Sequence, residues 1–175
     1  MLWLFTDAQR LADPRAAVAR LPKGLCGVIL RHDLATDRAR LGRDLARICR
    51  ARRVALVVAG DARLAASLGA GVHLRAGRRV RMPALRRRSV LVTSSTHDLR
   101  ELRRAARAGA DLAFLSPAFP TASHPGASAL GALRWARMAG RAGLPVAALG
   151  GIDGDRVRAL PRNLCRGVGA IGALA

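Results

Sequence analysis

The stretch VALVVAGDARLAASLGAGVHL, Val54 to Leu74, contains one full repeat of the pattern that decides the fold. It opens with an apolar, β-prone run at Val54–Ala59, which has the length of a buried strand. Asp61–Leu68 follows as a segment with helical spacing, and Asp61 stands where a helix N-cap belongs. A second short apolar run, Gly71–Leu74, closes the stretch. This order of strand, helix and strand predicts a βα unit with a parallel sheet.

The same alternation continues along the whole chain. The expected strands are Leu2–Phe5, Cys26–Leu30, Val54–Ala59, Gly71–Leu74, Ser89–Val92, Leu112–Leu115, Val146–Leu149 and Val168–Ile171. The helical segments between them include Thr36–Ala51, Asp61–Leu68, Thr96–Ala108 and Ser128–Ala142, with Asp61, Thr96 and Ser128 as expected N-caps and Gly109 and Gly143 as expected C-terminal glycines. Eight strands alternating with helices predict an α/β protein with a closed (β/α)8 barrel.

The length of the chain sets limits on this barrel. Its 175 residues are interpreted as one domain, residues 1–175, and are fewer than the roughly 250 that such barrels average, so tight loops are expected. The expected eighth strand ends close to residue 175, so the barrel is expected to lack its last helix. The wall left bare there would be an apolar stripe on which a second copy could dock as a homodimer.

Composition and charge exclude several classes of protein. No apolar run reaches the roughly 18 residues of a membrane span, and the start, MLWLFTDAQR, does not have the pattern of a signal peptide. Three widely spaced cysteines fit neither a zinc site nor a disulfide framework, which favours a cytoplasmic protein with reduced thiols. The net charge of +20 would suit a polyanion. Because only Lys23 of the 31 basic residues is a lysine, and the arginines are spread without a binding motif, a biased composition is favoured over nucleic-acid binding.

Chemistry in a (β/α)8 barrel takes place on the loops that follow the strands. The loop after the expected sixth strand lies within LSPAFPTASHP, Leu115 to Pro125, and carries hydroxyl groups, prolines and a histidine. LGGID, Leu149 to Asp153, follows the seventh strand, and its glycines allow backbone N–H groups to approach an anion. Gly151 is therefore expected to form a phosphate grip with Ile171 and Gly172 after strand eight. A Gly-Gly pair is also common in plain tight turns.

Several motifs occur in a fixed order along the chain. They are Thr6-Asp7, Gly71-Val72-His73-Leu74, Ser95-x-His97, Gly109-Ala110-Asp111, Pro117-x-Phe119-Pro120-Thr121, Gly150-Gly151-Ile152 and Val168–Ala173. This ordered set resembles thiamine phosphate synthase and its sister, the TenI-type thiazole tautomerase, over nearly the whole chain. The resemblance implies a barrel acting in thiamine biosynthesis that binds a thiazole phosphate at loops seven and eight. In this family, the synthase couples the thiazole to hydroxymethylpyrimidine diphosphate with Mg²⁺, and the tautomerase isomerises the thiazole phosphate carboxylate.

The resemblance also assigns roles to individual residues. It implies that His97 moves a proton, as imidazole can near neutral pH, with Ser95 beside it as part of the catalytic set. The expected phosphate contacts are Arg31, Thr121, Ser123, His124, Gly150, Gly151, Ile171 and Gly172. A histidine at the start of a helix is the alternative interpretation of His97. His73 is expected to pack inside the barrel, and His32 is expected at the surface.

The chain departs from the synthase pattern at the diphosphate and metal positions. The departures are Ile29, Arg31 and Asp33 in place of Gln-x-Arg-x-Lys, Gly60-Asp61 in place of Asn-Asp, Arg75-Ala76-Gly77-Arg78 in place of Gly-Gln-x-Asp, His124 in place of lysine, and Gly172 in place of serine. Asp61 alone is a poor ligand set for Mg²⁺, and Arg78 repels the ion, so an incomplete magnesium site is expected. Three functions stay open: a synthase-like transferase, a tautomerase that uses His97, and a non-catalytic phosphate-binding barrel.

Overall fold

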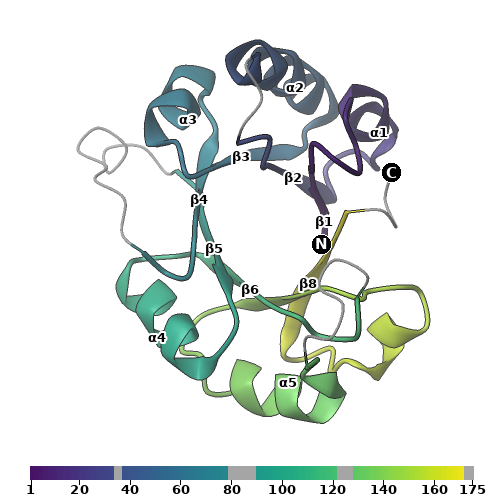
Figure 1. Cartoon of the computed structure of the whole chain (residues 1–175), viewed down its shortest axis with the longest axis vertical. Coiled ribbons are helices and arrows are strands. Elements are labelled where there is room, and N and C mark those ends of the chain that lie inside the picture. The colour runs from purple at the N-terminus through teal and green to yellow at the C-terminus, as the bar shows by residue number, and fades with distance from the viewer. Residues whose placement is uncertain (34–36, 79–89, 122–127, 172–175) are drawn as a thin grey trace. The chain divides into compact units, whose positions relative to one another are not determined.

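The apolar runs form the strands of a closed barrel, as predicted. The computed structural model describes residues 1–33, 37–78, 90–121 and 128–171. The strands are β1 (Leu2–Phe5), β2 (Cys26–Leu30), β3 (Ala55–Ala59), β4 (Gly71–Leu74), β5 (Val92–Thr96), β6 (Leu112–Leu115), β7 (Val146–Leu149) and β8 (Cys165–Ala170). They follow one another around the barrel in sequence order, and the registers from β1 to β4 and from β5 to β8 are parallel (Figure 1). The α/β class and the (β/α)8 barrel are thus confirmed.

The bounds of strand β5 differ from the prediction. It runs from Val92 to Thr96, and not from Ser89 to Val92. Thr93, Ser94 and Thr96 are buried in spite of their hydroxyl groups. The hydroxyl of Thr96 donates to the backbone oxygen of Phe114 at 3.1 Å, which satisfies a polar atom that burial would otherwise penalise. Apolar runs do not indicate such a strand, because Thr93 to Thr96 all carry hydroxyl groups.

The helices lie between the strands as expected, with shifted ends. They are α1 (Arg15–Arg20), α2 (Arg38–Arg52), α3 (Ala62–Leu68), α4 (Leu99–Arg107), α5 (Gly131–Ala139) and the 3₁₀ helix η2 (Arg156–Ala159). Asp61 caps α3 as predicted, because its Oδ1 accepts a hydrogen bond from the backbone N–H of Leu64 at 2.9 Å. The other two expected caps are wrong. Thr96 lies in β5 and Asp98 caps α4, while α5 follows Leu130 without a side-chain cap and not Ser128.

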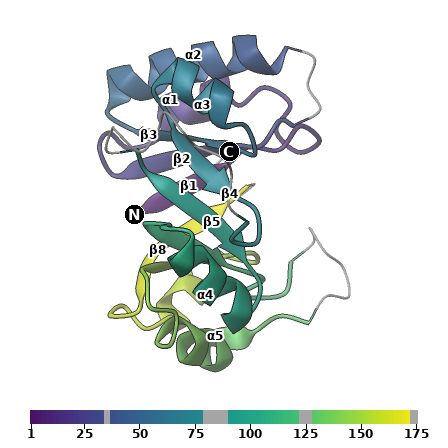
Figure 2. The same ribbon diagram turned by 90° about the vertical axis from the view of Figure 1, so that its left-hand side faces the viewer.

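The chain forms two compact units. The described part of the first unit lies within residues 1–73, 90–92 and 171, and that of the second within 74–78 and 93–170. In the first unit, α1, α2 and α3 lie together on the outer side of β1, β2 and β3 (Figure 2). Its core contains Trp3, Phe5 and Leu45, each at most 1% exposed, and the ring of Phe5 on β1 meets the ring of His73 on β4 edge-on, with the centroids 5.7 Å apart.

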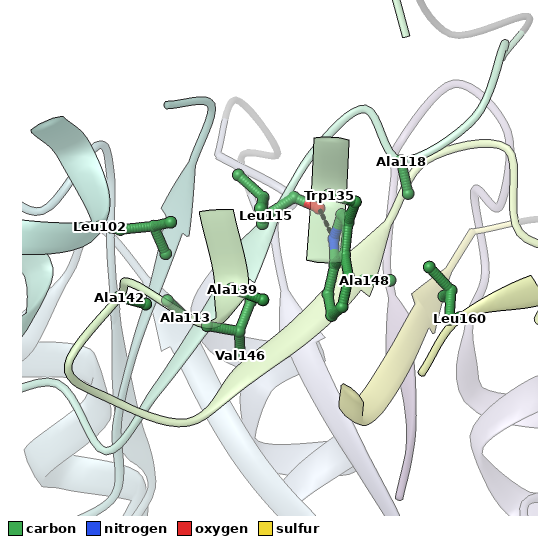
Figure 3. Packing of buried hydrophobic residues seen from close by; sticks show 10 residues of the cluster. All are labelled: Leu102, Ala113, Leu115, Ala118, Trp135, Ala139, Ala142, Val146, Ala148 and Leu160. Carbon is green, nitrogen blue, oxygen red and sulfur yellow. Dashed lines mark hydrogen bonds between the residues drawn. The ribbon is translucent and has the colours of Figure 1, made fainter. Parts of the chain in front are cut away.

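The core of the second unit surrounds Trp135 on α5 (Figure 3). Trp135 is fully buried, and its indole N–H donates to the backbone oxygen of Leu115 at 3.3 Å. Leu102 from α4 and Val146 from β7 belong to the same cluster. This packing fixes the end of β6, where the loop with the expected site residues begins. Among the described residues, no helix is long and apolar enough to cross a membrane.

Candidate functional site

His97 and Ser116 meet at neighbouring strand ends in the second unit. The register of β5 and β6 pairs Thr96 with Leu115, so the residues that follow are neighbours. The Nδ1 atom of His97 lies 2.9 Å from the backbone oxygen of Ser116 and 3.3 Å from its hydroxyl oxygen. A carbonyl oxygen can only accept a hydrogen bond, so Nδ1 carries the hydrogen. In the neutral ring, Nε2 is then the unprotonated nitrogen that can accept a proton.

A residue in the first turn of α4 binds the backbone of His97. The carboxylate of Glu101 accepts from the backbone N–H of His97 at 2.8 Å. The backbone N–H of Glu101 in turn donates to the capping carboxylate of Asp98 at 2.7 Å. His97 itself remains exposed. Its ring is therefore held at one nitrogen, its backbone is fixed, and the side chain stays accessible to a ligand.

Ser95 supports a loop and makes no hydrogen bond with His97 among the described residues. Its hydroxyl oxygen accepts from the backbone N–H of Ala76 at 3.4 Å, and the hydroxyl oxygen of Ser94 accepts from Gly77 at 3.0 Å. Gly77 has a φ of +65°, and a Cβ atom there would lie 2.7 Å from the backbone nitrogen of Ala105. The two serines thus fasten the loop after β4 against β5. The catalytic role expected for Ser95 stays a prediction.

The loops after β6 and β7 are joined backbone to backbone. The N–H of Ala118 donates to the oxygen of Leu149 at 2.8 Å, and the N–H of Phe119 to the oxygen of Gly150 at 3.1 Å. Gly151 has a φ of +64°, and a Cβ atom there would lie 2.5 Å from the backbone oxygen of Phe119. Gly151 therefore allows the two loops to approach each other, a packing role that its place in a Gly-Gly pair did not predict.

Arg156 adds a guanidinium group, which pairs with Asp153, to this junction. Its Nη1 atom donates to the backbone oxygens of Pro120 at 3.3 Å and Gly151 at 3.1 Å. Asp153 accepts from the backbone N–H of Arg156 at 2.8 Å and pairs with its guanidinium at 3.4 Å. Within the part of the chain that the structure describes, the backbone N–H groups of Gly151 and Ile152 have no acceptor. Two free amides and a guanidinium form a junction that can attract an anion.

The sequence patterns did not indicate Arg156 as a site residue. The spacing from Asp153 to Arg156 fits a capped helical turn, which is a local signal. It contains no information on the contact with Pro120, which lies 36 residues earlier in the chain.

The remaining predicted site residues are distributed as follows. Thr121 is half-buried and directly follows Pro120, so it belongs to the loop after β6. Arg31, which is exposed after β2, belongs to the first unit, as do Asp61 and Ile171. Ser123, His124 and Gly172 lie outside the described residues, so a phosphate grip shared by Gly151 and Gly172 stays a prediction. The structure thus places His97 against Ser116 at the end of β6, and the loop after β6 against Gly150 and Gly151.

The prediction that His32 lies at the surface is wrong. His32 is only 3% exposed. Its Nδ1 atom lies 2.9 Å from the hydroxyl oxygen of Thr6. The same oxygen accepts from the backbone N–H of Arg31 at 2.9 Å. Since Thr6 follows β1 and His32 lies just past β2, this contact ties the two strand ends together.

The residues at the expected metal position do not fit a magnesium ion. Asp61 uses Oδ1 to cap α3, and its Oδ2 faces the Arg38 guanidinium at 3.8 Å. Among the described residues, no group of three or more histidine, cysteine, aspartate or glutamate side chains could hold a metal. Mg²⁺ needs several oxygen ligands in a near-octahedral arrangement. A carboxylate that is shared between a helix cap and a guanidinium does not supply them.

Comparisons with known proteins support the family resemblance. A family model described as thiamine monophosphate synthase matches residues 2–174. The thiamine-phosphate synthase of Geobacillus thermodenitrificans is 35% identical over 147 residues, covering 79% of this chain. The aligned part spans 65% of that relative, so the chain corresponds to somewhat less than two thirds of its length.

Solved structures show the same fold. Thiamine phosphate pyrophosphorylase from Pyrococcus furiosus is similar with a TM-score of 0.79 and 22% identity, over 98% of this chain and 85% of that chain. A 3-keto-L-gulonate-6-phosphate decarboxylase from Vibrio cholerae follows with a TM-score of 0.70 and 12% identity, over 100% of this chain and 89% of that chain. At these identities the likeness concerns the fold alone. From the match of the family model along nearly its whole length, we conclude that this chain belongs to the thiamine monophosphate synthase family.

Proposed function

We propose that this protein is an enzyme of thiamine biosynthesis that binds a thiazole phosphate and moves a proton on it through His97. The observation that carries this proposal is the hydrogen bond from His97 Nδ1 to the backbone oxygen of Ser116, at 2.9 Å. It leaves Nε2 of an exposed ring as a base with a defined direction. Nε2 would take a proton from one ligand atom and return it to another. Such an isomerisation balances without a co-reactant.

The junction of the loops after β6 and β7 supports the phosphate half of this proposal. The backbone amides of Gly151 and Ile152, which have no acceptor among the described residues, and the guanidinium of Arg156 are the groups expected to meet phosphate oxygens. Thr121 follows in the same loop region and would add a hydroxyl donor. These groups and His97 all belong to the second unit. One small phosphorylated molecule is therefore the proposed ligand.

A second candidate is the coupling reaction of the synthase. It is favoured by the 35% identity to the thiamine-phosphate synthase of Geobacillus thermodenitrificans. It would require a diphosphate held with its metal, and Asp61 is engaged by a helix cap and by Arg38. Proton transfer requires none of those ligands, so we rank it first. A barrel that binds the phosphate without any reaction is the remaining alternative.

The test follows the thiazole phosphate carboxylate with the purified protein. We expect His97→Ala to slow isomerisation by about 10²- to 10⁴-fold, the usual contribution of a general acid or base. Binding of the same ligand, measured by calorimetry, should change little because the phosphate groups lie in other loops. Arg100→Ala, an exposed change on the same helix as the His97 support, should leave both quantities unaltered.

The alternatives give different results in the same assays. Unchanged turnover in His97→Ala would exclude His97 as the proton carrier. Formation of thiamine phosphate from both substrates would favour the synthase reaction. Tight binding without isomerisation or coupling would leave the non-catalytic barrel.

A further inference from the structure

A buried guanidinium lies among three oxygen atoms in the first unit. Arg38 begins α2, and its side chain is only 15% exposed. Its Nη2 atom lies 3.1 Å from Asp33 Oδ1 and donates to the backbone oxygen of Ala59 at 2.6 Å. Its Nη1 atom lies 3.8 Å from Asp61 Oδ2. Asp33 follows β2, and Ala59 and Asp61 lie at the end of β3, so one side chain connects two strand ends.

The oxygen atoms around Arg38 are of the type that hard divalent cations prefer as ligands. Two carboxylates and a backbone carbonyl are oxygen ligands suited to Mg²⁺ or Mn²⁺. A metal ion would need them at about 2.0–2.1 Å, but the nitrogens of Arg38 already stand against these oxygens. Guanidinium and metal therefore exclude each other, both by space and by repulsion between like charges.

The position of Arg38 is set by its terminal nitrogens. Its Nε atom is buried and has no hydrogen-bond partner within the described residues. A buried N–H without an acceptor is costly. The side chain nevertheless keeps this position, so the contacts of Nη1 and Nη2 with the three oxygens outweigh that cost.

We propose that Arg38 is a built-in replacement for a divalent cation, which neutralises Asp33 and Asp61 and keeps metal out of their oxygens. The ends of β2 and β3 would then suit a phosphorylated ligand that binds without a metal ion. They would not suit a diphosphate that carries a chelated metal ion. This inference does not rest on the reaction of His97, because all its residues belong to the first unit.

The test measures Mn²⁺ binding without any substrate, by electron paramagnetic resonance and calorimetry. The wild-type protein should show no saturable binding at millimolar Mn²⁺. Arg38→Ala should gain one site, since it removes the cation that lies against the oxygens of Asp33, Asp61 and Ala59. Arg38→Lys keeps a cation there and is the matched control, which should remain without metal.

A second substitution tests whether Asp61 is one of the residues that bind Mn²⁺. Adding Asp61→Asn to Arg38→Ala should abolish the new site, while asparagine can still cap α3. Mn²⁺ should also raise the Tm of Arg38→Ala and leave that of the wild type unchanged, because a ligand stabilises only the protein that binds it. If Arg38→Ala does not fold, Arg38→Gln provides the same comparison.

Two results would overturn the proposal. One is saturable Mn²⁺ binding by the wild type that Asp61→Asn removes. The other is a folded Arg38→Ala, or Arg38→Gln in its place, that gains no Mn²⁺ site. Neither outcome depends on catalysis, so a failure here is distinguishable from an inactive His97.

Discussion

The direction of the His97 ring is decided by an atom that is 19 residues away in the sequence, the backbone oxygen of Ser116. The motif Ser95-x-His97 indicates His97 as a candidate proton carrier, yet it contains no information on which ring nitrogen would be free. The hydrogen bond to Nδ1 supplies this information. Because the acceptor is a main-chain atom, any side chain at residue 116 that preserves the backbone should preserve the orientation of His97.

Gly151 carries a prediction at the level of a single residue. Gly151→Ala should lower the free energy of unfolding by about 1–3 kcal/mol, because a side chain is strained at a φ of +64° and would meet the backbone oxygen of Phe119. Affinity for inorganic phosphate should fall as well, since the loops after β6 and β7 must separate. Urea unfolding and calorimetry would measure the two effects.

Gly154→Ala is the matched control for Gly151→Ala. A Cβ atom at Gly154 meets nothing within 4 Å, and its φ is not positive. This variant should unfold like the parent or become slightly more stable through lower chain entropy. Equal stability of Gly151→Ala and Gly154→Ala would show that the loops do not need the glycine at residue 151.

Among the elements, β5 shows that a polar segment can form a buried strand when its surroundings supply hydrogen-bond partners. The segment from Val92 to Thr96 is largely polar, and the fifth strand was expected to end at Val92. It is stable inside the barrel because its hydroxyl groups meet backbone partners, including the oxygen of Phe114 for Thr96. Those partners belong to other segments of the chain, so local hydrophobicity could not predict them.

The cap of α4 provides a prediction at the scale of an element. Asp98→Ala should cost about 1 kcal/mol of the free energy of unfolding, since it removes the acceptor for the backbone N–H of Glu101 at 2.7 Å. Because Glu101 holds the backbone of His97, turnover should also decrease. Chemical denaturation and the isomerisation assay measure the two effects. Asp98→Asn keeps an acceptor and should restore most of both; if it behaves like Asp98→Ala, the cap is not the cause.

At the scale of the whole molecule, the composition makes the response to alkaline pH unusually simple. The chain has a net charge of +20, no tyrosine, and Lys23 as its single lysine. Arginine stays protonated far above neutrality, so few side chains besides the cysteines titrate between pH 9 and 12. Burial raises the pKa of the Cys49 thiol from 9.0 to about 12.

This raised pKa predicts a loss of stability in alkali. The folded state keeps the Cys49 proton longer than the unfolded chain does, so its contribution is complete below pH 9 and is lost as pH rises toward about 12. Unfolding free energies measured across this range should therefore decrease. Cys49→Ala should flatten the decrease, whereas Val57→Ala, a buried truncation without a thiol, should lower stability and keep the slope. An equally steep decrease in Cys49→Ala would assign the effect to other groups.

The sequence by itself determined the barrel, most strand and helix positions, the Asp61 cap and the family motifs. These are local properties: apolar periodicity, N-cap residues and short ordered motifs act over a few neighbouring residues. The polar part of β5, Thr93 to Thr96, and the burial of His32 were not predicted, because their stability comes from partners on other strands.

Only the tertiary structure decided which atoms meet at the strand ends. Arg38 is one arginine among many in the sequence, and its place between Asp33 and Asp61 arises when β2 and β3 pair. Arg156 likewise reaches Pro120 only once the loops after β6 and β7 have joined. Charge–charge contacts and hydrogen bonds need short distances between remote residues, and the folded barrel supplies those distances.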